Sequence, residues 1–131
     1  MKEKDEMMSA LRNLALDRTA ARLMREDIAR IEEDIKKELP EEQREALEKV
    51  RRRLLSCAVV TEHHIDRMDR LLALLTPEEQ KVLDHMLIHP HPEAAFDLAD
   101  ELAYEPCSIY RIRARAISKL VRLRYGAGAR V

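Results

Sequence analysis

A chain of 131 residues is expected to form one globular domain or one small domain plus an extension, and 37% charged with only 3% aromatic side chains argue against a large conventional core. All of its aromatic residues lie at or after Phe96, and residues 1–95 contain no glycine. This composition suits long helices packed through aliphatic seams rather than a globule. The two isolated cysteines form neither a disulfide framework nor a metal-binding pair.

The net charge of −1 hides an uneven distribution along the chain. Residues 1–75 carry 16 basic and 17 acidic side chains, and residues 76–105 carry 1 basic and 8 acidic side chains. Residues 106–131 carry 7 basic side chains and none that is acidic. Such a basic element indicates nucleic acid as a partner, although a solvated helix neutralised by its acidic neighbour would show the same charges.

No stretch of the sequence is apolar enough to cross a bilayer. The longest apolar runs are Ala58–Val60 and Leu71–Leu75, whereas a membrane-spanning helix needs about 20 apolar residues. The first residues, MKEKDEMMSALRNL, lack the apolar region of a secretory signal. We therefore expect a cytoplasmic protein without a membrane partner.

Residues from about 5 to 39 show a helical pattern, because apolar residues recur at steps of three and four. Arg18 and Arg25 interrupt this stripe, so its first part is weak. Pro40 then lacks the amide that a continuing helix needs, and it disfavours helical geometry at Leu39. The stripe consists of Met7, Leu11, Leu14, Ala21, Ile28, Ile31 and Ile35.

The second predicted helix, at about 40–74, has the heptad pattern typical of coiled-coil packing. The short break at Pro40 favours an antiparallel hairpin with the first helix. A seam that also faced another protomer would make a homodimer, and the sequence does not choose between the two. The seam consists of Leu47, Val50, Leu54, Cys57, Thr61, His64, Met68, Leu71 and Leu75.

Three members of this seam are unusual. We expect Thr61 and His64 to hydrogen-bond locally or to specify register, as single polar seam positions do. A pH switch at His64 has no support in the sequence. Cys57 is most simply a small buried apolar residue.

A third helix is predicted to begin after Leu75. Thr76 suits the N-cap, Pro77 the first helical position, and Glu79 completes a capping box. The apolar positions Val82, Leu83, Met86 and Leu87 carry this helix to about Ile88. It ends at the His-Pro-His-Pro segment 89–92, whose prolines enforce an extended connection.

Histidines in and after this helix raise the question of a metal site. His85 and His89 are one helical turn apart, and His91 is close by in the sequence. No cysteine or carboxylate at a recognisable ligand spacing completes a set of three or four ligands. We therefore interpret the segment as a rigid turn and assign no metal.

The segment from Glu93 to Gly126 has the spacing of a helix-turn-helix, which needs a small residue where the helices cross, a compact turn residue and a branched apolar anchor. Ala99, Ala103 and Ile109 meet these three requirements in order. Apolar support comes from Leu98, Leu102, Tyr104 and Ile112.

The last predicted helix has distinct faces at 100° per residue. Its core side consists of Ile109, Ile112, Ala116, Leu120 and Leu123. Small residues opposite would let it enter the major groove, where Arg111, near its N-terminal end, is our candidate base reader. Arg115, Lys119 and Arg122 are candidate phosphate contacts. The complete predicted DNA-binding set is Cys107, Ser108, Tyr110, Arg111, Arg115, Lys119 and Arg122.

Several motifs resemble region 4 of bacterial sigma factors, and more closely the phage late-transcription regulators of the ArpU and RinA type. They are L-T-P-E-E-Q-K-V-L from Leu75, L-A-D-E-L from Leu98, I-Y-R-I-R-A-R-A-I-S-K-L from Ile109 and L-R-Y-G from Leu123. The resemblance implies promoter-region DNA as the ligand and bacterial RNA polymerase as a further partner. Ala103 stands where the family commonly has glycine, and Pro106 and Cys107 stand where sigma factors place charged promoter readers.

No catalytic constellation or cofactor motif is present, so we expect neither an enzyme nor a bound cofactor. The predicted protein is all-α: a long, coiled-coil-like helical hairpin at 1–75, a sigma region 4-like helix-turn-helix head at 76–126 and a flexible tail at 127–131. The predicted function is sequence-specific regulation of transcription, encoded by a phage or prophage and exerted on double-stranded DNA. The alternatives are a phage small terminase subunit, and a sigma- or polymerase-binding module without DNA binding.

Overall fold

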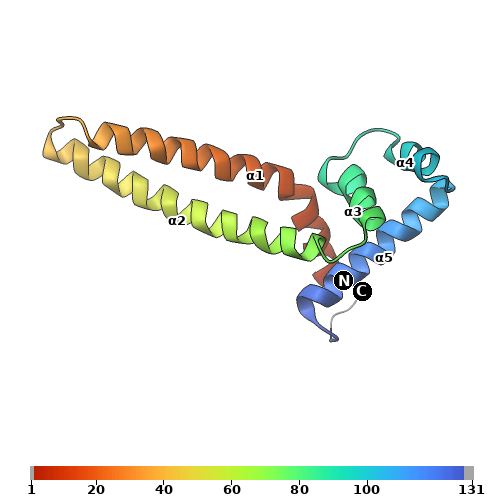
Figure 1. The fold of residues 1–131 in the computed structure, drawn as a ribbon. Coiled ribbons are helices and arrows are strands. Elements are labelled where there is room, and N and C mark those ends of the chain that lie inside the picture. Colours follow the sequence, from red (N-terminus) through yellow and green to blue (C-terminus); the bar gives the residue numbers. More distant parts are fainter. Residues whose placement is uncertain (1, 129–131) are drawn as a thin grey trace. The chain divides into compact units, whose positions relative to one another are not determined.

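The computed structural model describes residues 2–128, which are all-helical and contain no strand (Figure 1). The predicted all-α class is therefore confirmed. The elements are α1 (Lys2–Ile35), α2 (Glu41–Leu72), α3 (Pro77–Leu83), the π-helical turn η1 (Asp84–Ile88), α4 (Ala94–Leu102) and α5 (Pro106–Tyr125). Of the predicted tail, residues 129–131 lie outside the described part. None of the described helices combines the length and the apolarity that crossing a lipid bilayer requires.

The chain divides into two compact units. One unit, which we call the hairpin unit, consists of residues 16–66. The other, which we call the head unit, consists of the first 15 residues together with those from 67 onward. Helices α1 and α2 each contribute residues to both units.

In the hairpin unit, α1 and α2 run antiparallel and side by side (Figure 1), as the sequence predicts. Charged pairs connect the two helices. The Arg25 guanidinium donates two hydrogen bonds to the Glu62 carboxylate, with Nε–Oε2 and Nη2–Oε1 distances of 2.8 and 2.6 Å. One of the two arginines that interrupt the apolar stripe therefore reaches across the hairpin to a carboxylate.

Of the two polar seam residues, Thr61 hydrogen-bonds locally, as the sequence predicts. The Thr61 hydroxyl donates to the Cys57 carbonyl oxygen, one turn back, at 2.8 Å. His64 Nε2 lies 3.7 Å from an Asp17 carboxylate oxygen on the facing helix. Both side chains therefore find partners without leaving the hairpin.

The apolar seam of α2 differs from the predicted heptad in two positions. Cys57 and Val50 are exposed, the latter to 47%, whereas Ala58 is fully buried. The prediction of a buried Cys57 is therefore wrong. A two-helix hairpin covers only one side of each helix, so positions at the edge of a wide apolar stripe stay open to solvent.

The turn between α1 and α2 is held by Arg44. Its Nη1 donates to the carbonyl oxygen of Ile35, the last residue of α1, at 2.7 Å, and its Nη2 donates to that of Lys37 at 3.2 Å. The last carbonyls of a helix have no partner within it, and an arginine satisfies them with the favourable charge for that end.

In the head unit, side chains of α3, α4 and α5 form one apolar cluster. Ala99 and Ile109, predicted as the crossing residue and the anchor, are both buried there. The end of α5 lies beside the start of α1, where the Tyr125 hydroxyl donates to a Glu6 carboxylate oxygen at 2.9 Å. The cluster consists of Val82, Ala95, Leu98, Ala99, Ile109 and Ile112, with Met86 and Leu102 packed against it.

Candidate functional site

The first turn of α3 contains the predicted capping box. The Thr76 hydroxyl accepts from the Glu79 amide at 3.2 Å, and the Glu79 carboxylate accepts from the Thr76 amide at 2.9 Å. Lys119 of α5 lies 3.4 Å from the same carboxylate, whose side chain is only 7% exposed. The cap therefore also ties α3 to α5.

Three influences act on the Glu79 carboxyl. Burial raises its pKa, but the hydrogen bonds from Thr76 and the ammonium of Lys119 lower it, and the net result lies below the ordinary value. Glu79 is therefore held in its charged form in the folded chain.

The turn between α4 and α5 consists of residues 103–105. Ala103 adopts the left-handed conformation with φ of 57° and ψ of 41°. The amides of Ala103 and Tyr104 both donate to the Ala99 carbonyl, which closes α4 in the manner of a Schellman end. Ala103, the compact residue predicted for the turn, thus adopts a conformation that is usually occupied by glycine.

Tyr104 does not provide the predicted apolar support. It is 44% exposed, and its hydroxyl donates to a Glu78 carboxylate oxygen at 3.1 Å. This hydrogen bond raises the pKa of the Tyr104 phenol. The left-handed residue before Tyr104 turns the chain away from the core, so the ring lies outside the cluster and bonds to α3.

Four of the five predicted core positions of α5 are buried: Ile109, Ile112, Ala116 and Leu120. Leu123 is instead 45% exposed, which contradicts the prediction. Ile117 and Val121, which the prediction left out, are buried. Toward the C-terminal end of α5, the buried face therefore shifts around the helix to include Ile117 and Val121. Leu123 no longer lies on the buried face.

The predicted DNA-binding residues lie on the open side of α5. Arg111, Arg115 and Arg122 are exposed, and their side chains form no ion pair or hydrogen bond within residues 2–128. Tyr110 is 53% exposed, and Ser108 is half-buried. Cys107 is exposed and its Sγ lies 3.8 Å from a carboxylate oxygen of Glu105. Lys119 is also exposed, but its ammonium group pairs with the Glu79 carboxylate.

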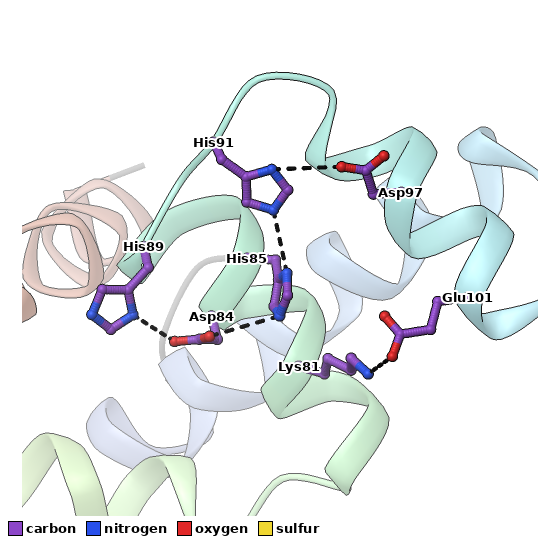
Figure 2. Close-up of polar contacts among 7 residues, drawn as sticks. All are labelled: Lys81, Asp84, His85, His89, His91, Asp97 and Glu101. Atoms are coloured by element: carbon purple, nitrogen blue, oxygen red, sulfur yellow. Dashed lines mark hydrogen bonds and ion pairs between the residues drawn. The ribbon is translucent and has the colours of Figure 1, made fainter.

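A second polar cluster lies on η1, the loop after it and α4, and we call it the histidine–carboxylate cluster (Figure 2). Its contacts run from His89 through Asp84, His85 and His91 to Asp97. His89 Nδ1 lies 2.8 Å from Asp84 Oδ1, and His85 Nδ1 lies 3.3 Å from His91 Nε2. Lys81 pairs with Glu101 beside it.

The pairing within this cluster was not apparent from the sequence. Spacing suggested His85 with His89, but His89 contacts Asp84 and His85 contacts His91 instead. The last turn of the helix is π-helical, with the His89 amide donating to the Asp84 carbonyl at 2.7 Å. No pattern in the sequence predicts a π-helical turn. Within residues 2–128, no three histidine, cysteine or carboxylate side chains are grouped to hold a metal ion.

Comparisons with known protein families, with curated proteins and with solved structures return no match for this chain.

Proposed function

We propose that the chain is a sequence-specific, DNA-binding regulator of transcription, encoded by a phage or prophage. In this proposal α4 and α5 act as a helix-turn-helix, and α5 lies in the major groove of double-stranded DNA. The observation that carries the proposal is the row of exposed, unpaired guanidinium groups of Arg111, Arg115 and Arg122 on the side of α5 away from the core. Guanidinium groups bind both guanine edges and phosphates.

The packing beneath this face supports the proposal. Helices α4 and α5 approach through the small side chains of Ala95 and Ala99, and the turn between them is three residues long. Both features are typical of a helix-turn-helix. Ala114 is exposed between the arginines, so the groove-facing side has little bulk to keep the helix from the base edges.

The partners follow from the charges and from the resemblance to ArpU- and RinA-type regulators. Promoter-region DNA is the primary ligand, and bacterial RNA polymerase is a second partner. Acidic side chains of α3 and α4 already contact Lys81, Lys119 and Tyr104. The exposed Arg111, Arg115 and Arg122 of α5 are not part of these contacts and are therefore available to a polyanion.

Selection from a random-sequence duplex library, with the full-length chain, tests the proposal. We expect an enriched motif and an affinity that falls as salt rises. The absence of salt-sensitive binding to any duplex would overturn it, and co-purification with RNA polymerase would then favour an interaction module. A ring-sized mass in solution, with DNA binding retained, would favour the small terminase subunit.

A further inference from the structure

The imidazoles of His85 and His91 lie close together, edge to face (Figure 2). His85 Nδ1 and His91 Nε2 lie 3.3 Å apart, and the two rings are inclined by 73°. The outer nitrogen of each ring faces oxygen. His91 Nδ1 lies 3.2 Å from the Pro92 carbonyl oxygen and 3.7 Å from Asp97 Oδ2, and His85 Nε2 lies 3.9 Å from Asp84 Oδ2.

Of these oxygens, the Pro92 carbonyl lies within hydrogen-bond distance and favours an N–H on His91 Nδ1. A neutral imidazole carries one N–H and one lone pair. An N–H on His91 Nδ1 donates to Pro92, which leaves the lone pair on Nε2. For His85, the tautomer with its N–H on Nε2, the side of the Asp84 carboxylate 3.9 Å away, leaves the lone pair on Nδ1. In these tautomers both lone pairs border the space between the rings. The other tautomer of His85 donates a hydrogen bond to His91 Nε2, and a metal ion bound to both nitrogens takes the place of that hydrogen.

The spacing fits a metal ion. Two nitrogens bound at ~2.0–2.1 Å to a tetrahedral ion lie about 3.4 Å apart, close to the 3.3 Å between His85 Nδ1 and His91 Nε2. A carboxylate or carbonyl behind each ligating ring is the usual support of a metal-binding histidine. Imidazole suits Zn²⁺, Ni²⁺ and Cu²⁺.

We propose that His85 and His91 form a two-histidine site for a divalent transition-metal ion, with water completing the coordination. Their side chains are 35% and 38% exposed, so an ion and its waters reach both nitrogens. Residues 76–105 carry 8 acidic and 1 basic side chains, a local charge that attracts a cation. His89 is left out of the site, because its contact runs to Asp84, whereas His85 and His91 contact one another. Binding would clamp η1 to the loop before α4, independently of any binding to DNA.

Calorimetric titration of the untagged, EDTA-treated full-length chain with Zn²⁺ and with Ni²⁺, near neutral pH, tests this proposal. We expect saturable binding at a single site and a rise in the melting temperature with metal concentration, since the ion binds the folded state. Replacing either His85 or His91 by Gln should weaken binding by tenfold or more, and Asp97→Asn by about tenfold.

Two further histidines serve as matched controls. His89→Gln removes a neighbour of the site, and His63→Gln a histidine of the hairpin unit. Both variants should retain the wild-type affinity. The proposal is overturned if neither metal binds at millimolar concentration, or if binding survives in both His85→Gln and His91→Gln. Equal weakening in the two controls would also overturn it.

Discussion

Arg111 and Arg122 are both exposed on α5 but lie at opposite ends of the helix. The N-terminal part of a recognition helix reads bases, and the later part contacts phosphates. We expect Arg111→Ala to relax base preference at one or two base pairs, at a cost of about 1–3 kcal/mol on the best site. Arg122→Ala should weaken all sequences alike. Binding of variants to the selected site and to scrambled duplexes measures both effects.

Arg113 provides the control for this pair. It is half-buried on another side of the same helix, so Arg113→Ala should leave base preference unchanged. If Arg111→Ala lowered the affinity for every sequence equally, the assignment of Arg111 as a base reader would be wrong.

Ala103 adopts a conformation that is costly for a residue with a β-carbon. The left-handed region costs an L-residue about 1–2 kcal/mol, and glycine at such a position costs about 0.4–1 kcal/mol in unfolded-state entropy. We expect Ala103→Gly to stabilise the fold by about 0.5–1 kcal/mol. Urea unfolding measures the change. Ala114→Gly, in the middle of α5, is the matched control and should destabilise by about 1 kcal/mol. A loss of stability in Ala103→Gly would contradict the expectation.

Glu79 makes the stability of the chain depend on pH. Its pKa in the folded state lies below the ordinary value of 4.5, so folding favours the ionised carboxyl. The stabilisation is complete above about pH 4.5 and is lost as pH falls through the folded pKa, because the unfolded state then binds more protons. We expect the free energy of unfolding to fall with acidification less steeply in Glu79→Gln than in wild type.

Thr76→Ala tests the same pH dependence by changing the partner of Glu79 instead of Glu79 itself. It removes the hydroxyl that accepts from the Glu79 amide and belongs to the cap that lowers the carboxyl pKa. Its pH dependence should shrink as well, with a loss of about 1 kcal/mol at neutral pH. Parallel pH profiles of wild type and both variants would show that Glu79 does not carry the effect.

The elements differ in how far the sequence predicts them. The helix start at Thr76, the break near Pro40 and the long hairpin follow from capping chemistry, proline geometry and apolar periodicity. The exposure of Cys57 and Leu123 cannot be predicted in this way. Periodicity gives the direction of an apolar stripe but not how much of the stripe a neighbouring helix covers. The π-helical turn cannot be predicted from the sequence either, because it depends on how the chain leaves the helix.

The direction in which the candidate arginines of α5 point follows from helix geometry. A helix fixes the relative directions of its side chains, so Arg111, Arg115 and Arg122 lie away from Ile109 once that residue is buried. The pairing of Lys119 with Glu79 depends on tertiary contact between α5 and α3. Spacing within one helix does not report such a contact.

At the scale of elements, Arg44 joins the two long helices at their turn. We expect Arg44→Ala to lower the stability by about 1–2 kcal/mol, because carbonyls at the end of α1 lose a charged donor. Thermal or urea unfolding measures the loss. Arg52→Ala, at an exposed position of the same helix, is the control and should change stability little. Equal effects of both substitutions would show that the capping contact contributes nothing specific.

At the scale of the whole molecule, the charges are separated along the chain rather than balanced locally. The acidic segment 76–105 precedes the basic segment 106–131. We expect the logarithm of the DNA affinity to fall with the logarithm of salt at a slope between about −2 and −3 per bound chain, for two or three phosphate contacts. Binding titrations over a salt series measure this slope. A flat salt dependence would contradict phosphate contacts by Arg115, Lys119 and Arg122.

The turn η1 has a consequence for the spacing of the histidines around it. In a π-helical turn the hydrogen bond spans one residue more than in an α-helix, so η1 has the form of a single-residue insertion absorbed without a loop. Deleting one residue from Asp84–Ile88 should restore regular α-helix and separate His85 from His91.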